Sequence, residues 1–157
     1  MAYIDEVLAD SPLVYWRLDE TSGTTAADAS GNARPGAHTG VTVGQPSLLG
    51  DGSGKSAAYN STGYTRISHG AWVNVAQPTV EVRYKPTTAS LTGTKVLASV
   101  WSTGTGNPQR WILWLNNGKV EAFIYSSGSL SAIGATTLTA GVTYTIAFKY
   151  DGSQGLR

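Results

Sequence analysis

Three oxygen-bearing side chains, Asp28, Ser30 and Asn32, stand at alternate positions in a glycine-containing loop. A hard cation such as Ca²⁺ takes several oxygen ligands from a loop of this kind, backbone carbonyls included. Asp19 and Asp151 would be further donors for such a site. The alternative is a turn closed by its own side chains, because Asp and Asn bond readily to nearby backbone groups. The run holds a single carboxylate where a tight site uses more, so both interpretations remain open.

Aromatic side chains form the second candidate site, since the chain contains five tryptophans and eight tyrosines. Rings pack against the CH faces of sugars and lose little entropy on binding. We predict a ligand site at Trp72, Trp101 and Trp114, with Asn107 from the polar loop between residues 102 and 109. A polar loop ringed by aromatics suits the rim of such a site.

The opposing interpretation is that the tryptophans fill the interior, and it is strongest for Trp16 and Trp111. Trp111 and Trp114 are three residues apart in one expected strand. An odd spacing puts their rings on opposite faces, so one can be buried while the other is exposed.

Catalytic side chains are sparse. Glycoside hydrolysis commonly uses two carboxylates with distinct roles, yet Glu81 and Glu121 each stand alone on an expected strand. The two histidines, His38 and His69, accompany no Gly-x-Ser-x-Gly elbow, although residue order alone does not rule out a hydroxyl–His–carboxylate triad. We therefore expect a protein that is not an enzyme and has no cofactor beyond the calcium considered above.

Composition narrows the class of protein further. The 157 residues are 41% hydrophobic and only 13% charged, with a net charge of +1 and no cysteine. A nearly neutral chain has no field for gathering phosphates, so nucleic acid is not an expected partner. The acidic N-terminal segment lacks the features of a secretory signal, and no apolar run approaches the ~20 residues of a membrane helix. We expect a soluble protein.

Periodicity predicts strands along most of the chain, with one or two helical turns over Ile4–Leu8, stopped before Pro12. Alternation of apolar and polar residues is clearest in the second half, and Asn117-Gly118 between two apolar runs predicts a tight hairpin. The expected strands are 13–18, 38–43, 56–59, 64–67, 79–85, 95–101, 110–115, 119–125 and 143–150.

Many short strands separated by turn residues predict an all-β fold, a two-sheet antiparallel jelly-roll sandwich. No fixed repeat and no linker divides the chain, so we predict a single domain over residues 1–157.

Five motifs in order resemble laminin-G-like modules of the concanavalin-A-like jelly-roll class, over nearly the whole chain. They are the opening YWRLDETSGT with ADASGN (residues 15–24 and 27–32), the glycine-rich turn GSGKSAAY (52–59), the strand VEVRYKP (80–86), the hairpin LNNGKV (115–120) and the turn YDG (150–152). In the strand motif, Arg83-Tyr84 stands where Trp and a β-branched residue are more usual in the family.

This resemblance implies a function and a location. The run VLADSPLVYWRL is most similar to versions in minor tail and adhesion proteins of phages of actinobacteria. It implies a non-catalytic virion module that binds host-surface glycan or another virion protein. The alternatives are a purely structural decoration or assembly protein and, less favoured, a glycosidase relative.

The family adds further strands after the late turn, and here the sequence stops at Arg157. We therefore expect a homo-oligomer or larger assembly in which a neighbour completes the sheet, because an unpaired strand edge promotes association.

Overall fold

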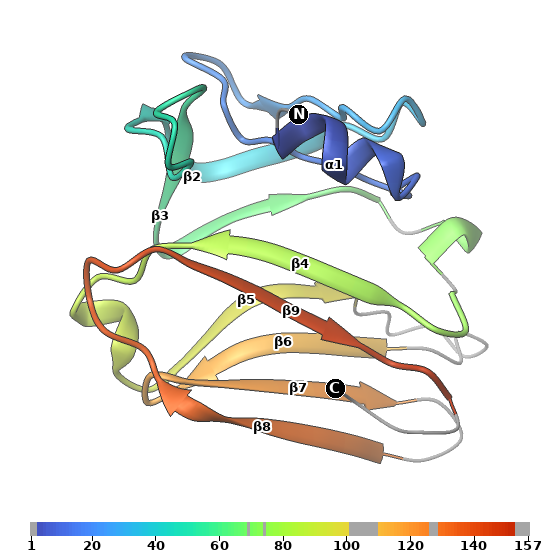
Figure 1. Cartoon of the computed structure of the whole chain (residues 1–157). Coiled ribbons are helices and arrows are strands. Elements are labelled where there is room, and N and C mark those ends of the chain that lie inside the picture. The colour runs from blue at the N-terminus through green and yellow to red at the C-terminus, as the bar shows by residue number, and fades with distance from the viewer. Residues whose placement is uncertain (1–2, 69, 74, 101–109, 126–128, 153–157) are drawn as a thin grey trace. The chain divides into compact units, whose positions relative to one another are not determined.

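The computed structural model describes residues 3–68, 70–73, 75–100, 110–125 and 129–152. Within them the chain is built mostly of antiparallel strands, with one short α-helix near the N-terminus (Figure 1). These features of the predicted fold are confirmed. Residues 1–68 form one compact unit and residues 69–157 a second, called here the first and second units. The prediction of a single domain stays a prediction.

The first unit begins with α1 (Tyr3–Ala9), as the apolar spacing predicts. Three antiparallel strands follow: β1 (Thr25–Ala26), β2 (Gly36–Gln45) and β3 (Ser56–Arg66), in the order β1-β2-β3. The two predicted strands 56–59 and 64–67 are parts of the single strand β3. The ladder between β2 and β3 is interrupted by two register shifts.

The predicted strand over residues 13–18 is wrong, because the segment makes only one isolated bridge, between Trp16 and Asp28. Leu18 has a φ of 57°, in the left-handed region, which ends any extended course. The Trp16 indole N–H donates to the backbone carbonyl of Arg34 at 2.8 Å rather than to water. Side-chain contacts, rather than a strand ladder, therefore hold this apolar run.

The second unit contains two sheets. β4 (Thr79–Tyr84) pairs with β9 (Tyr144–Lys149). β5 (Thr94–Val100), β6 (Arg110–Asn116), β7 (Lys119–Tyr125) and β8 (Ser129–Thr137) form a four-stranded antiparallel meander in that order. Two single-turn 3-10 helices, η1 (Ala71–Val73) and η2 (Ala89–Leu91), lie in the connections.

The predicted hairpin joins β6 and β7. Asn117 and Gly118 both have positive φ, 48° and 78°, as the two central residues of a type I′ turn require. The turn fixes the register that pairs Leu115 with Val120 and Trp114 with Glu121.

The core of the second unit lies between its two sheets, which gives a sandwich-like arrangement. Leu113 and Leu115 of β6 are completely buried, and Ile146 and Phe148 of β9 pack into the same cluster. Trp111 meets Phe148 edge-to-face, with ring centroids 5.5 Å apart, so this ring belongs to the interior as the alternative interpretation expects. Burying each large apolar side chain contributes roughly 1.5–3 kcal/mol. Among the helices that the structure describes, none is long and apolar enough to cross a membrane.

Candidate functional site

The four-stranded sheet carries an apolar and aromatic surface on the face that points away from the core. Because Leu113 and Leu115 point inward, their neighbours on β6 point outward. The cross-strand register adds the outward residues of β5, β7 and β8. We call this surface the outer face. Its members include Val96, Arg110, Ile112, Trp114, Asn116, Lys119, Glu121, Phe123, Tyr125 and Ile133.

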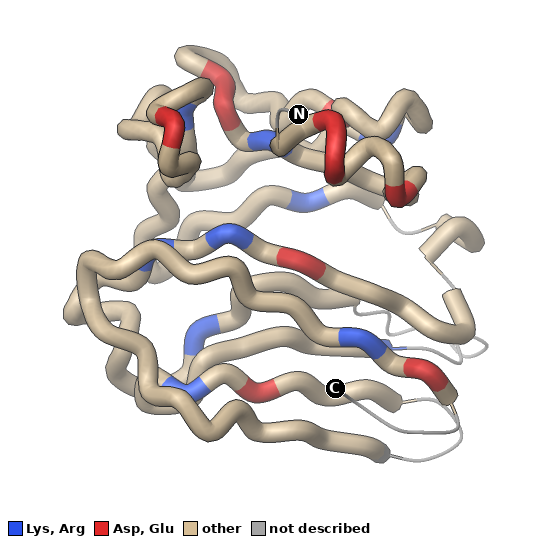
Figure 2. The backbone as a smooth tube through the Cα atoms, viewed as in Figure 1, with Lys and Arg blue, Asp and Glu red and all other residues tan. Residues whose placement is uncertain are grey.

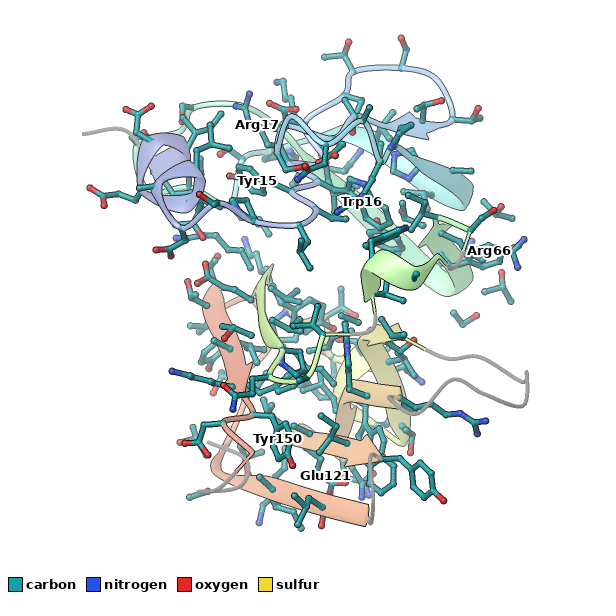
Figure 3. All side chains as sticks on the ribbon, turned by 90° about the vertical axis from the view of Figure 1, so that its right-hand side faces the viewer. Tyr15, Trp16, Arg17, Arg66, Glu121 and Tyr150 are labelled. Carbon is teal, nitrogen blue, oxygen red and sulfur yellow. The ribbon has the colours of Figure 1, made fainter. Side chains whose placement is uncertain are left out.

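Trp114 lies at the centre of the outer face, directly opposite Glu121. Its indole N–H donates to Glu121 Oε2 at 2.7 Å, and its ring stacks with that of Phe123 at a centroid distance of 6.3 Å and an interplanar angle of 23°. Asn116 Nδ2 donates to Glu121 Oε1 at 3.0 Å. We call these four residues the Trp114 platform. Figure 3 labels Glu121 in the strands of the second unit.

The platform combines two kinds of chemistry. Its half-buried rings offer a flat apolar surface, while each Glu121 oxygen accepts one of the two hydrogen bonds above and retains a further lone pair. The carboxylate is held in one orientation by neutral donors, so it can accept from hydroxyl groups of a ligand lying on the rings. A single carboxylate does not supply the separate acid and nucleophile of the common hydrolytic mechanisms.

The structure places the residues predicted to bind ligand on different elements. Trp114 is on the platform, whereas Trp72 lies on η1. A Cβ added at Gly70 would be 2.7 Å from Trp72 Cδ1, so the indole of Trp72 covers Gly70. Trp101 and Asn107 lie outside the described residues.

Sequence reasoning missed three members of the platform, Asn116, Glu121 and Phe123. The signal was present, since a two-residue Asn117-Gly118 turn pairs residue 116 with 119 and therefore 114 with 121. Glu121 taken alone resembles an ordinary solvated residue. The register places Glu121 opposite Trp114, and its carboxylate accepts the hydrogen bond of the Trp114 indole N–H.

Asp28, Ser30 and Asn32 do come together in the first unit, around the Asp28 carboxylate. Asp28 Oδ1 accepts from the backbone N–H of Tyr15 and of Ser30, both at 3.0 Å. Oδ2 accepts from the Ser30 hydroxyl at 2.8 Å and the Arg34 N–H at 2.9 Å. Four donors occupy this carboxylate, so a cation would have to displace them.

Two neighbouring features extend the loop. Asn32 Nδ2 donates to the carbonyls of Pro12 and Leu13 at 3.1 and 3.2 Å. Asp19 pairs with Arg17 at 2.8 Å, and Figure 3 shows Arg17 beside Tyr15 and Trp16 on the segment that follows α1. The loop therefore ties residues 12–16 to residues 28–34. The calcium prediction stays a prediction.

The hydrogen bonds of Asp28 have an electrostatic consequence. Burial by itself raises the pKa of this carboxyl, but the bonds from Tyr15, Ser30 and Arg34 favour the charged form and lower the pKa from 3.8 to about 2.

A second polar network in the first unit runs through His38, whose side chain is only 2% exposed. Its Nδ1 shares a hydrogen bond with Thr65 Oγ1 at 2.7 Å, and Thr65 Oγ1 shares another with the Tyr59 hydroxyl at 2.6 Å. On the other side, His38 Nε2 is 3.7 Å from Glu20 Oε2. Glu20 Oε1 accepts from the N–H of Ala27 at 2.7 Å.

The Thr65 hydroxyl, the His38 imidazole and the Glu20 carboxylate follow one another as in the hydroxyl–His–carboxylate triad considered from the sequence. Its geometry favours a structural role, because the imidazole is buried and the His–Glu distance exceeds a hydrogen bond. The pKa of Tyr59 is raised above its usual value, chiefly by burial. The hydrogen bond to Thr65 lowers this pKa and the Glu20 charge raises it, and the net effect is an increase. His69, the other histidine, lies outside the described residues.

Within the part of the chain that the structure describes, no group of three or more His, Asp or Glu side chains is placed to hold a metal ion. Comparisons of the chain with protein-family models, with curated proteins and with solved structures find no match.

Proposed function

We propose that this protein is a non-catalytic binding module of a phage virion, of the minor-tail or adhesion kind, with a laminin-G-like jelly-roll fold. Its ligand is a glycan of the host surface, bound on the Trp114 platform. The observation that carries the proposal is the stacked Trp114–Phe123 pair beside an oriented carboxylate. Sugars combine an apolar CH face with hydroxyl donors, and the platform offers a partner for each.

The carboxylate of Glu121 favours a ligand with hydroxyl donors at the centre of the platform. The net charge is +1, and Glu121 places a negative group at the centre of the platform. A phosphate placed directly on Glu121 would be repelled, whereas a hydroxyl group can donate to it. Arg110 and Lys119 lie on the same face, opposite Tyr125 and Asn116 in the ladder, so this preference is confined to the platform.

The test is binding of fluorescently labelled chain to intact actinobacterial cells, with purified cell-wall polysaccharide as competitor. Saturable binding that the polysaccharide abolishes is the expected result. Trp114→Ala and Glu121→Gln should each weaken it by about tenfold or more, equivalent to ~1.4 kcal/mol. Tyr64→Ala is the matched control, because Tyr64 is an aromatic residue of the first unit that is 45% exposed.

Folding of each variant is checked by circular dichroism before binding is measured. Binding that is unchanged in both platform variants would contradict the assignment of the site. A parallel sample with EDTA tests calcium: loss of binding that Asp28→Asn reproduces would support a metal at that loop.

A purely structural role in the virion is the second candidate. It is favoured by β8 at one edge of the four-stranded sheet, since an edge strand without charge or proline is suited to assembly. Absence of cell binding well above micromolar concentration, together with recovery of the chain in assembled particles, would favour this candidate over the first.

A further inference from the structure

The second unit contains an apolar groove of about 280 Å³ beside β9. Its floor is the inward face of β6, β7 and β8, with Leu113, Val120, Ala122 and Ala132 among its lining residues, and its wall is formed by Phe148 and Ala147 of β9. Leu113 and Phe148 are also members of the core cluster. The groove is therefore a part of the sandwich interior that the described residues leave open.

The cause is the unequal size of the two sheets. The sheet of β4 and β9 has two strands, whereas the facing sheet has four. Among the described residues, no strand pairs with the second edge of β9. The inward faces of β7 and β8 therefore extend beyond the layer that should cover them.

β8 lies at the edge of the larger sheet next to this groove. Its nine residues include no Lys, Arg, Asp, Glu or Pro, and Figure 2 shows it without a charged position. Ile133 is 65% exposed and Leu130 is 40% exposed. Proteins usually guard such edges with charges, proline or bulges, because an open edge pairs readily with another strand. β8 has no charge or proline, and its one register shift against β7 lies after Ile133, so residues 129–133 keep regular pairing.

We propose that a second copy of this chain occupies the groove, in a two-fold dimer in which β8 of each copy pairs with β9 of the other. The axis runs along the strands, between the two layers. It places the four-stranded sheet of one copy beside the two-stranded sheet of its partner. Each layer then has six strands, and both grooves are filled by one operation.

The directions of the strands suit this arrangement. β8 and β9 run in opposite directions (Figure 1), and a rotation about an axis along the strands preserves those directions. The new β8–β9 contact is therefore antiparallel, like every strand pair in the second unit. The contact is isologous, as closed dimers require.

The chemistry of the groove also favours a second copy. Neither the groove lining nor β8 contains a charged residue. β9 adds one, Lys149, whose exposed side chain lies on the opposite face of the strand from Phe148 and so points away from the groove. β8, β9 and the remaining groove residues come to about 18 residues a side, close to the ~20–30 of a standard interface. The Trp114 platform lies on β6 and β7 and takes no part in the contact, so the dimer does not rest on the proposed glycan site.

The first test uses the absence of cysteine from the chain. Ser131→Cys on β8 and Ala147→Cys on β9 are made as separate variants and treated with a short bismaleimide. A mixture of the two should give a covalent dimer, whereas each variant alone should stay monomeric on a denaturing gel. Crosslinking within either single variant, or none in the mixture, would overturn the proposal.

The second test places a charge at the contact. Ala132 points toward the groove, whereas its neighbour Ser131 is opposite Phe123 on the outer face. Light scattering should show a dimer for the original chain and for Ser131→Lys, and half that mass for Ala132→Lys. A monomeric original chain at micromolar concentration, or an unchanged mass for Ala132→Lys, would contradict the dimer.

Circular dichroism would detect a loss of fold in Ala132→Lys. In that case the cysteine crosslinking experiment, which leaves Ala132 unchanged, decides whether the dimer forms. Cell binding by a monomeric chain would separate failure of the dimer from failure of the glycan proposal.

Discussion

At the scale of single residues, the first unit depends on side chains that hold backbone segments together where strand pairing does not. Asp28 binds the N–H groups of Tyr15 and Arg34, which lie on either side of it in the chain. Buried backbone donors without partners are costly, so one carboxylate here replaces a ladder.

Acid should remove this contribution. The pKa of Asp28 is about 2 in the folded protein and 3.8 ordinarily. The stabilisation is therefore complete above pH 4 and is lost as the pH falls toward 2, and for this partly exposed group it amounts to about 1–2 kcal/mol. Urea unfolding of the original chain and of Asp28→Asn, between pH 4.5 and 2, measures it. An equal loss of stability in both proteins over this range would argue against the assignment.

Thr65 is the central member of the His38 network. Thr65→Val keeps the shape but removes the hydroxyl that bonds both His38 and Tyr59. Because the buried imidazole then loses its partner, the free energy of unfolding should fall by about 1–3 kcal/mol. Thr39→Val, at an exposed position on β2, is the control and should change it by no more than ~0.5 kcal/mol. Equal effects in denaturant titration would refute the network's role.

At the scale of elements, alternation was sufficient for β4 and β9, which have apolar residues at every second position. The Asn117-Gly118 turn between two apolar runs was sufficient for β6 and β7. β8 was missed because Ser, Ala, Gly and Thr dominate it and give no period. The segment 13–18 was misassigned because its apolar run is held by side-chain bonds and turns at Leu18. An apolar run therefore does not always mean a strand.

The β6–β7 turn gives a prediction at this scale. Gly118 has a φ of 78°, and a Cβ there would lie 3.3 Å from Thr137 Cγ2. Gly118→Ala should therefore lower the free energy of unfolding by about 1–2 kcal/mol, and should weaken glycan binding because the turn sets Trp114 opposite Glu121.

Gly50→Ala is the matched control, since a Cβ at residue 50 meets nothing within 4 Å. Thermal unfolding and cell binding are measured on both variants. Full stability and binding in Gly118→Ala would show that the register does not depend on this glycine.

At the scale of the whole molecule, sequence pattern could not supply the long-range pairing. No local signal says that β4 pairs with β9, or that one sheet has two strands and the other four. The same holds for the candidate site. Trp114 was predicted from its residue type and spacing, whereas its partners in the platform depend on the pairing register of β6 and β7. The calcium and glycan assignments stay predictions until the binding experiments are done.

The core of the second unit provides a global test. Leu113 is completely buried, and Val96 is 59% exposed on the outer face. Leu113→Ala leaves a cavity and should cost about 2–5 kcal/mol of unfolding free energy, while Val96→Ala should cost little. Denaturant titration of both variants checks the inward and outward assignment of the sheet; similar losses would show the assignment to be wrong.

The pairing of β4 with β9 also fixes the order in which the protein can assemble during synthesis. About sixty residues separate Tyr84 from Tyr144, its partner in the ladder, so β4 leaves the ribosome seconds before its partner exists. The β5–β8 meander closes through short connections and can form first. Among the described strands only β9 pairs with β4, so Val80 and Val82 lack that partner until β9 is made. This is the interval in which a chaperone or a neighbouring nascent chain would contact them.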